Sequence, residues 1–392
     1  MRRKICIVVH SRANYGRIKS VMSAVRDHPE LELQLLVSSS AVLKRYGNVV
    51  EIIKSDGFTP NSMFYSMVEG SNPITMAKST GLAVIELATN FDNIKPDVVL
   101  TVADRFETMA TAIAASYMNI PLAHTQGGEV TGSIDDSVRH AITKLSHIHF
   151  PATERSKEYI IRMGEDPETV YLTGCPSIDL LVNLDLSLPT DIFSKYRGVG
   201  SDLNPKNPYI VVLQHPVTTE YGDGILQIKE TLKAVNKISS KNLQVAWLWP
   251  NIDAGSDDIS KGIRAFRELN TVDDIHFFIN FEPEDYVRLI KNSKCIVGNS
   301  SSGLREGAYL GIPCVNIGNR QKGRERAKNV IDVGYDEVGI QSAILEQVKN
   351  GSYESSKLVG DGSAGEKIAN ILAAVEIKIN KTLGYTVDTK LI

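Results

Sequence analysis

The sequence predicts an α/β protein with two doubly wound, largely parallel sheets, one in each of two domains. Short apolar runs alternate with helical patterns from the N-terminus onward, and this alternation stops and then restarts near the middle of the chain. Alternating strands and helices are typical of a parallel sheet that carries helices on both faces. The run at 98–102 is apolar except for one threonine, as expected for a strand covered on both sides. A length of 392 residues is sufficient for two domains.

The predicted elements divide the chain into three parts. In the first domain, expected over 1–184, strands are predicted at 5–9, 33–37, 97–102, 121–124, 147–150 and 170–172, with helices at 18–25, 77–90, 106–117, 138–145 and 156–163. Residues 185–207, rich in Pro, Gly, Ser and Asn, are interpreted as a linker. In the second domain, expected over 208–369, strands are predicted at 209–213, 243–248, 276–279, 294–297 and 314–317. A last helical pattern, from 364 to about 381, belongs clearly to neither domain.

The composition argues against several classes of function. The net charge is −3, so no overall basic field would attract nucleic acid or an anionic membrane. The four cysteines are scattered without a CxxC pair, which disfavours a zinc knuckle or a redox pair. No apolar run approaches the roughly 18 residues of a membrane span, and the first apolar run is too short for a signal peptide. We therefore expect a cytoplasmic protein.

The most informative segment is a hydroxyl-rich turn at 298–306, which contains Ser300, Ser301 and Glu306. An apolar run leads into this turn and a helical pattern leads out of it, so it connects a predicted strand to a predicted helix. Free backbone N–H groups and the positive end of a helix dipole at such a turn bind anions, phosphate in particular. The segment therefore predicts a site for a phosphorylated ligand.

Polar clusters follow two of the predicted strands of the first domain. After the first strand, Arg12 and the backbone of Gly16 are candidate phosphate contacts, although an ordinary turn with a solvated arginine has the same pattern. After the third strand, Asp104 and Arg105 are candidates for a general base and a phosphate ligand. Asp104 is equally a candidate helix N-cap, with Glu107 as its partner in a capping box. Ligands of such folds bind at the carboxyl ends of the strands, so the natural site is the cleft between the domains.

The segment after the fourth strand combines three glycines with a high density of ionisable groups. The glycines would let the backbone approach a ligand closely. Glu129, Asp135 and Arg139 are candidates for acid–base chemistry, and the last two are four residues apart on one helix face. The alternative is a helix that is capped by Ser133 with Asp136 as its partner, in which Asp135 and Arg139 form a surface ion pair.

Three further clusters follow strands of the second domain. His215 is a candidate proton carrier or phosphate contact, although lone histidines are more often structural. Asn251 and Asp253 are candidates for holding sugar or ribose hydroxyls, or for an Asx turn. The segment at 318–326 contains four cations, Arg320 among them, which would neutralise a diphosphate, although a charge run is usually a solvated face.

Other chemistries lack their motifs. The GxGxxG, Walker and GxSxG patterns are absent, and the HxH at 147–149 has no third ligand at zinc spacing. We therefore expect neither a metal ion nor a cofactor.

Seven motifs stand in order along the chain: SRANYG at 11–16, ADRFE at 103–107, HTQGGEVTGSIDDSVRHAITKLSH at 124–147, GCPS at 174–177, QHPVTT at 214–219, PNIDAGS at 250–256, and GNSSSGLREG with GNRQKGRER at 298–307 and 318–326. Together they resemble the hydrolysing UDP-N-acetylglucosamine 2-epimerases, the enzymes that open sialic-acid-type biosynthesis. The resemblance covers roughly residues 3–325. The epimerase domain of the animal bifunctional epimerase/kinase is similar in the same segments, and we expect no kinase domain here.

The resemblance implies a GT-B architecture, with a UDP-sugar in the cleft between two Rossmann-like domains. It also implies that a final helix, at about 370–392, packs back on the first domain. The residues implied to hold UDP are Arg12, Arg105, His215, Asn251, Ser300, Ser301, Glu306 and Arg320, and those implied to carry or support the chemistry are Asp104, Asp135 and Arg139. Many members of the family have a carboxylate where this chain has Gln126. An amide cannot act as a base, so Gln126 is expected to contact the substrate, and the base is Asp104, Asp135 or Glu129.

The implied reaction converts UDP-N-acetylglucosamine and water to N-acetylmannosamine and UDP. A base, in first place Asp104 and in second place Asp135, removes the C2 proton while UDP leaves from C1, and water then adds to the resulting 2-acetamidoglucal. Many members of the family also have a histidine where this chain has the serines at 38–40. This departure and Gln126 would fit a modified sugar, such as the UDP-2,4-diacetamido-2,4,6-trideoxyglucose of the legionaminic-acid route.

Three alternatives remain open at the level of the sequence. They are a non-hydrolysing 2-epimerase, a GT-B glycosyltransferase and a nucleotide-sugar binding protein without turnover. Whichever holds, the expected partner is a UDP-sugar, and the expected assembly is a homodimer or homotetramer.

Overall fold

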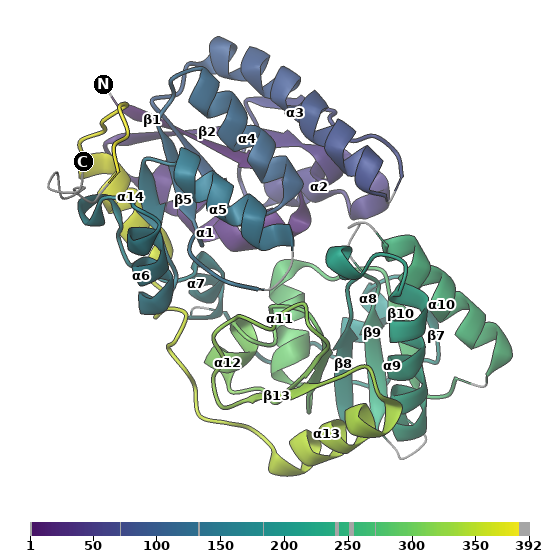
Figure 1. Cartoon of the computed structure of the whole chain (residues 1–392). Coiled ribbons are helices and arrows are strands. Elements are labelled where there is room, and N and C mark those ends of the chain that lie inside the picture. Colours follow the sequence, from purple (N-terminus) through teal and green to yellow (C-terminus); the bar gives the residue numbers. More distant parts are fainter. Residues whose placement is uncertain are drawn as a thin grey trace, which may run out of the picture.

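Two largely parallel sheets form the framework of the protein, as the alternation of strands and helices predicts (Figure 1). The structure, a computed structural model, describes residues 2–70, 72–131, 134–182, 184–239, 243–250, 255–270 and 272–383. The first sheet has the order β3-β2-β1-β4-β5-β6, and all its strands are parallel. Its strands are β1 (Arg3–Val9), β2 (Leu31–Ser38), β3 (Ser62–Phe64), β4 (Val98–Val102), β5 (Leu122–Thr125) and β6 (Ile148–Phe150).

Helices cover both faces of this first sheet because alternate side chains of each strand point to opposite faces. Ile5, Ile7 and Val9 of β1 are buried on the face covered by α1, whereas Cys6 and Val8 are buried on the face covered by α3 and α4. The helices of the first domain are α1 (Arg12–Asp27), α2 (Val49–Ser55), α3 (Pro73–Ile94), α4 (Phe106–Tyr117), α5 (Ile134–Leu145), α6 (Glu154–Arg162) and α7 (Pro176–Val182).

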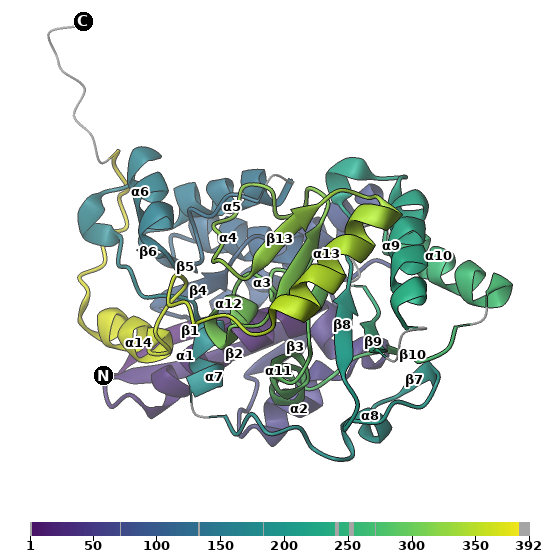
Figure 2. The ribbon, with the colours of Figure 1, turned by 90° about the horizontal axis from the view of Figure 1, so that it is seen from below.

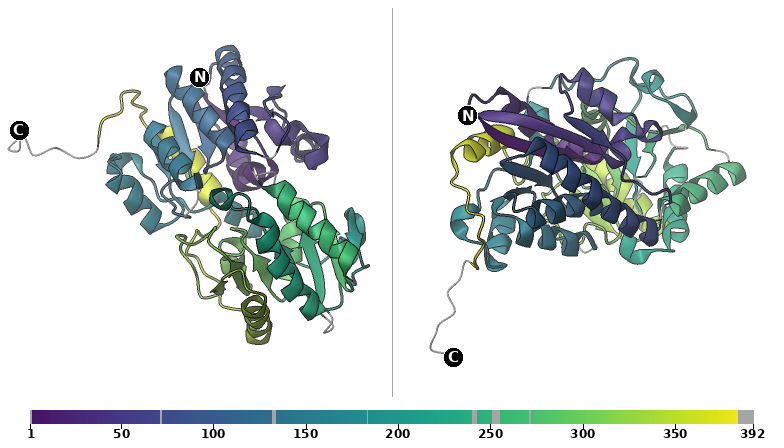
Figure 3. Two further views of the ribbon diagram at one scale, coloured as in Figure 1. Left: turned by 45° about the vertical axis from the view of Figure 1, so that its right-hand side comes forward. Right: turned by 90° about the horizontal axis from the view of Figure 1, so that it is seen from above.

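The second sheet repeats this plan with the order β13-β12-β11-β8-β9-β10-β7. Its strands are β7 (Gly198–Gly200), β8 (Tyr209–Leu213), β9 (Gln244–Leu248), β10 (Ile275–Phe278), β11 (Ile296–Gly298), β12 (Cys314–Ile317) and β13 (Val330–Val333). Its helices are α8 (Ile192–Lys195), α9 (Gly224–Ser239), α10 (Ser256–Leu269), α11 (Pro283–Lys291), α12 (Glu306–Leu310) and α13 (Glu337–Asn350). Short 3-10 turns occur at Ser39–Val42, Lys44–Tyr46, Pro167–Thr169 and Thr218–Glu220. Figure 3 shows the two domains from two further sides.

The segment interpreted as a linker is partly structured, which corrects the prediction. Residues 185–207 contain α8 and β7, and β7 pairs antiparallel with β10 at the edge of the second sheet. The strand predicted at 170–172 is also wrong, because only a single bridge joins Val170 to His149. β3 and β13, which were not predicted, are short edge strands whose sequences carry little strand signal.

The C-terminal helix has different bounds from the predicted ones. α14 (Ala364–Ala374) begins before residue 370 and ends well before 392. It packs on α1 and α7 of the first domain, where Ile368 and Leu372 are fully buried (Figure 2). The chain beyond it stays on this domain, since Lys381 Nζ donates to the carbonyl oxygens of Thr143 and Lys144, at 3.0 and 2.8 Å, at the end of α5. Among the described residues, no helix is both long and apolar enough to cross a membrane.

Each sheet has one point at which the order of its strands reverses, between β1 and β4 in the first and between β8 and β11 in the second. At such a point neighbouring loops diverge to opposite faces of the sheet, which leaves a crevice outside the carboxyl ends of the strands. Arg12 follows β1 and Asp104 follows β4, while His215 follows β8 and Ser300 follows β11. The clusters singled out in the sequence therefore flank both crevices.

Candidate active site

A cavity of about 260 Å³ lies where the two crevices face each other. From the first domain it is lined by Arg12, Gly16 and Arg17 of α1. From the second domain it is lined by His215, Ser300, Ser301, Glu306 and Arg320, together with apolar side chains such as Trp249 and Ile279. Seven residues predicted from separate segments of the sequence thus meet at one place, and the cavity combines cationic, hydroxyl and apolar groups.

The hydroxyl-rich turn contributes its side chains more than a helix dipole. The Oγ atoms of Ser300 and Ser302 lie 3.0 Å apart, and Ser302 Oγ is also 2.6 Å from Tyr286 Oη. The helix that follows, α12, has only five residues. The macrodipole is the sum of aligned peptide dipoles and five residues make little more than one turn, so the predicted contribution of a helix N-terminus is small here. Anion binding at this turn would depend on the serine hydroxyls and nearby arginines.

The run of cations at 318–326 is divided among three tasks, which corrects its interpretation as a single diphosphate clamp. Arg320 lines the cavity and donates to the Asn299 carbonyl at 3.1 Å. Arg324 pairs with Glu129 of the first domain at 3.1 Å, and Arg326 pairs with Asp332 at 2.7 Å. Arg320 is therefore the member of this run that is placed to meet a ligand in the cavity.

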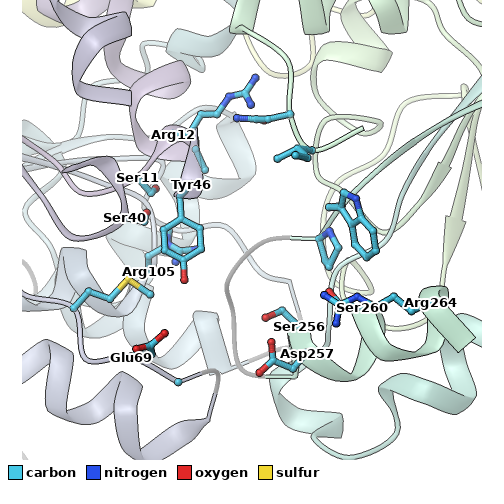
Figure 4. Close-up of a pocket in the computed structure, with 17 residues that line it drawn as sticks. Ser11, Arg12, Ser40, Tyr46, Glu69, Arg105, Ser256, Asp257, Ser260 and Arg264 are labelled. Carbon is cyan, nitrogen blue, oxygen red and sulfur yellow. The ribbon is translucent and has the colours of Figure 1, made fainter. Parts of the chain in front are cut away.

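A second space, of about 530 Å³, adjoins the first along the cleft. Figure 4 shows Arg12, Ser40 and Arg105 facing Ser256, Asp257 and Arg264 across it. Asn251 and Asp253, predicted to hold sugar or ribose hydroxyls, lie outside the described residues.

The loop between β4 and α4 differs from the predicted capping box. The N-cap of α4 is Arg105 rather than Asp104, and no side chain caps the helix there. Glu107 instead receives a hydrogen bond from Arg105 Nε at 3.1 Å and one from Ser39 Oγ at 3.3 Å. Asp104 is thus left to interact with other groups, and it pairs with Arg139.

Arg139 is the centre of a buried group of charges behind the cavity. It is fully buried, so the alternative interpretation, in which Arg139 belongs to a surface ion pair with Asp135, does not hold. Its guanidinium pairs with Asp104 and with Asp136, the latter at 2.7 Å, and it donates to the Glu129 carbonyl at 2.5 Å. Asp135, which directly precedes Asp136 in the sequence, is half-buried in the first turn of α5.

The charges around Asp104 decide its protonation state. Burial alone would raise its pKa, but the positive charges of Arg139 and Arg17 outweigh burial and hold the pKa well below its ordinary value. Asp104 is therefore ionised at neutral pH. Arg17 lines the cavity and its charge also acts on Asp104, so Arg17 lies between the ligand space and the Asp104 carboxylate.

Glu129 is engaged across the domain boundary, which argues against its predicted role as a base. Its carboxylate pairs with Arg305 and Arg324 of the second domain, and all three side chains are buried. Burial would raise the pKa of Glu129, but these two arginines hold it below the ordinary value. Glu129 thus joins the two domains instead of facing the ligand space.

Gln126 lies behind the site. It is fully buried with a left-handed backbone (φ 61°), and its Nε2 donates to Cys175 Sγ at 3.2 Å. It is not among the residues that line either cavity, so the predicted substrate contact is not supported; Asp104 and Asp135 do not line them either, so their proposed role requires a rearrangement when the sugar binds. The neighbouring glycines serve packing: a Cβ on Gly128 would lie 2.1 Å from the carbonyl oxygen of Ser156, and one on Gly127 would lie 2.9 Å from Thr143 Oγ1.

The HxH pattern at 147–149 has a structural role. His149 Nε2 contacts Glu165 at 3.0 Å, and the ring of His147 contacts the backbone N–H of Leu122 at 3.1 Å and the carbonyl of Ile379 at 3.0 Å. In the part of the chain that the structure describes, no group of three or more His, Cys, Asp or Glu could hold a metal ion.

Comparison with known proteins identifies the family. A family model described as UDP-N-acetylglucosamine 2-epimerase matches residues 23–373. The chain belongs to this family. A Legionella pneumophila protein named UDP-N,N'-diacetylbacillosamine 2-epimerase (hydrolyzing) is 33% identical over 98% of this chain and 100% of its own length. A Neisseria meningitidis protein named UDP-N-acetylglucosamine 2-epimerase is 29% identical over 95% of each chain.

Solved structures of 2-epimerases have the same fold. The crystal structure of UDP-GlcNAc 2-epimerase from Neisseria meningitidis bound to UDP-GlcNAc superimposes with a TM-score of 0.79 and 19% identity, over 94% of this chain and 99% of that one. The predicted GT-B arrangement of two Rossmann-like domains is thereby confirmed.

Four residues of this 2-epimerase site were missed in the sequence. Arg17 donates to Ser301 Oγ at 2.9 Å and lines the cavity, and its position right after Gly16 in the first helix was the available signal. Arg305 stands in the serine-rich motif, but nothing in the motif indicates that it pairs with Glu129 of the first domain. Asp136 was considered only as a cap partner. Nothing in the sequence pointed to Tyr286, which reaches the turn from α11.

Proposed function

We propose that this 2-epimerase is a hydrolysing enzyme that converts UDP-N-acetylglucosamine and water to N-acetylmannosamine and UDP. The observation that carries the proposal is the cavity at the facing crevices, in which Arg12, His215 and Arg320 meet the serines of the β11–α12 turn. The buried charges of Asp104 and Arg139 lie directly behind Arg17, at one end of this cavity.

The diphosphate is assigned to the serine turn and the surrounding arginines. Ser300 and Ser301 offer hydroxyl donors, and Arg12, Arg17 and Arg320 offer guanidinium groups from both domains. Donors that are already oriented toward the position of a developing charge stabilise a leaving group without reorganisation. Burial lowers the pKa of Arg12 to about 10, so this arginine stays charged at neutral pH and favours an anionic neighbour.

The bond-breaking step is assigned to the first domain. Asp104 takes the proton from C2 of the sugar, the C2–H electron pair forms the C1=C2 double bond, and the C1–O bond breaks with its electrons leaving on UDP. Water then supplies a hydroxyl to C1 and a proton returns to C2 on the opposite face, which yields free N-acetylmannosamine. Asp135 is the second candidate for the base.

For Asp104 to act as the base, its ion pair with Arg139 must loosen when the sugar binds. This pair keeps the pKa of Asp104 low, which secures the ionised form but weakens its affinity for a proton. Arg139 has a second carboxylate partner, Asp136, and keeps this ion pair when its contact with Asp104 loosens. His215, at the second-domain side of the cavity, is a candidate to carry the proton that returns.

A second candidate substrate is UDP-N,N'-diacetylbacillosamine, a 2,4-diacetamido sugar. It is favoured by the name of the Legionella pneumophila relative, whose similarity spans nearly the whole chain. The serines at the end of β2 are compatible with a modified sugar, because Ser40 lines the cleft where many members of the family have a histidine nearby.

The test is a side-by-side measurement of both UDP-sugars with product analysis by ³¹P and ¹H NMR. Steady release of UDP with a free amino sugar supports a hydrolysing enzyme, and the sugar with the higher kcat/KM is the substrate. A mixture of two UDP-sugars without free UDP would instead identify a non-hydrolysing 2-epimerase. No change in either sugar would favour a binding protein without turnover.

A further inference from the structure

One fully buried residue connects the parts of the second domain that line the cavity. Asn299 directly follows β11 and has no exposed surface. Its side-chain Oδ1 accepts from the backbone N–H of His215 at 2.7 Å, and its Nδ2 donates to the carbonyl of the same residue at 2.8 Å. Its own carbonyl accepts from Arg320 Nη1 at 3.1 Å and from Gln321 Nε2 at 2.9 Å.

We infer that Asn299 is the positioning residue that sets the geometry of the ligand-binding surface of the second domain. β12, β11 and β8 are neighbours in the sheet, and Asn299 ties the loops that follow all three at their carboxyl ends. Each of these loops supplies one of the polar groups of the cavity: Arg320, the Ser300–Ser301 pair, and His215. The Asn299 side chain does not line the cavity, so it acts through these neighbours.

Only an amide side chain satisfies this arrangement. The backbone of His215 presents one donor and one acceptor to the same side chain, and an amide offers one of each at the matching spacing. A carboxylate lacks the donor, and an apolar side chain lacks both groups. Either replacement leaves a buried polar atom of His215 without a partner, which is unfavourable enough to displace the loop.

The close approach of the strands supports the same conclusion. The residue before Asn299, Gly298, has φ +129°, and a Cβ there would lie 2.1 Å from the carbonyl oxygen of Leu213. The backbone N–H of Asn299 donates to that same oxygen at 3.2 Å. The ends of β8 and β11 are thus held at a distance that only glycine allows, which brings Asn299 within reach of His215.

Gln347 provides a matched control. It is also a fully buried amide of the second domain, and its Nε2 donates to two backbone carbonyls, those of Cys314 and Asn329, each at 2.9 Å. Cys314 begins β12, so Gln347 supports the opposite end of the sheet from the cavity. Replacing either amide by an apolar side chain of similar size removes hydrogen bonds to backbone and leaves the net charge unchanged.

The inference rests on the proposed function, because UDP is the probe. The experiment measures UDP affinity by calorimetry and the free energy of unfolding for the intact protein, Asn299→Leu and Gln347→Met. Asn299→Leu is expected to weaken UDP binding about tenfold, equivalent to about 1.4 kcal/mol, while Gln347→Met leaves it within about twofold at a comparable loss of stability. Asn299→Ser, a smaller change, is the alternative if the leucine variant does not fold, and the same loss is expected.

Two outcomes would overturn the inference: unchanged UDP affinity in the Asn299 variants, or an equal loss in Gln347→Met. If the intact protein itself fails to bind UDP, the proposed function is wrong. Hydrogen exchange then tests the positioning role of Asn299 without UDP. Faster exchange of the segments at 213–217 and 318–322 in Asn299→Leu than in Gln347→Met would support the positioning role. Equal exchange in the two variants would contradict it.

Discussion

At the scale of single residues, the site separates into groups that face the ligand space and groups that are buried behind it. Ser301 and Arg320 line the cavity, whereas Asp104 and Glu129 are held in ion pairs with arginines. This difference decides what each substitution should change. Substitutions of residues that line the cavity should change the affinity for the ligand. Substitutions of the residues buried behind it should change the rate of the reaction or the stability of the protein.

Asp104→Asn should abolish exchange of the C2 proton while leaving UDP binding nearly intact. Asparagine keeps the size of the side chain but cannot take up a proton, and general-base catalysis contributes about 10²–10⁴-fold to such steps. Arg139 retains Asp136 as a partner in this variant, so the protein should still fold. Turnover and UDP affinity are measured together.

The controls for Asp104→Asn are Ser301→Ala and Arg320→Ala, which should change UDP binding instead of the chemical step. Each removes a donor from the wall of the cavity, so each should weaken UDP binding by about five- to tenfold. Normal turnover in Asp104→Asn would show that the base is another residue.

Glu129→Gln should destabilise the protein strongly. It leaves Arg305 and Arg324 buried without their counter-charge, and breaking a buried ion pair in this way costs about 3–5 kcal/mol. Glu158→Gln is the matched control, because the Glu158–Arg162 pair is 55% and 72% exposed and contributes under about 1 kcal/mol. Urea denaturation compares the two, and equal stabilities would refute the interdomain role of Glu129.

At the scale of elements, most of the framework could be predicted from the sequence, and the exceptions have physical reasons. Buried parallel strands such as β4 and β8 carry continuous apolar runs, so they are visible in the sequence. Edge strands such as β3, β7 and β13 are short and half-exposed, and their pairing depends on neighbours distant in the sequence. The bounds of α14 were missed because its apolar face is completed only by α1.

The sequence predicts which residues lie at the carboxyl ends of the strands, but it does not predict which of these side chains contact one another. Arg12, His215 and Ser301 follow strands that flank the crevices, and Arg320 follows β12, the neighbour of β11, so their convergence follows from topology. The pairing of Arg139 with Asp104 does not follow from the sequence, because Asp104 follows β4 whereas Arg139 lies in α5, and their spacing fits no local motif.

Gly128→Ala tests the packing role of the loop between β5 and α5. The glycine has φ +74°, and a Cβ would lie 2.1 Å from the Ser156 carbonyl oxygen, so destabilisation of about 3 kcal/mol or more is expected. Gly81→Ala, in the exposed middle of α3 with open space around it, should instead stabilise by about 0.5–1 kcal/mol. Thermal or urea unfolding measures both. A tolerated Gly128→Ala would mean that this loop can move away from α6.

At the scale of the whole molecule, the two domains form one site by facing each other and by direct links between them. Besides Glu129 with its arginines, Arg17 contacts Ser301 at 2.9 Å and Lys19 pairs with Glu284 at 2.6 Å. α14 returns the chain to the first domain after the second is complete. The cavity therefore depends on the relative position of both domains.

The stability of the whole chain should decrease in mild acid. Burial lowers the pKa of His10 and of His124 to about 3, so both are neutral in the folded state. Unfolded histidine has a pKa near 6.5. The unfolded state therefore takes up protons below about pH 6.5 while the folded state does not, and stability is fully present above that pH and is lost as the pH falls toward 3.

Between pH 7.5 and pH 5.5 these two histidines should lower the free energy of unfolding by about 2–3 kcal/mol. Urea denaturation at the two pH values measures this change. His10→Gln should remove about half of it, whereas His28→Gln, a half-buried surface position, serves as the control. Equal stability at both pH values would mean that the buried histidines already carry protons in the folded state.

The central claim is that the facing crevices support an elimination that releases UDP and passes through a double bond between C1 and C2. The most direct measurement is incubation with the preferred UDP-sugar in heavy water, with the free sugar analysed by ¹H NMR. The account predicts one deuterium at C2 of the released N-acetylmannosamine-type product, together with stoichiometric UDP. Released sugar that keeps its original proton at C2, or a UDP-sugar that persists unchanged, would contradict it.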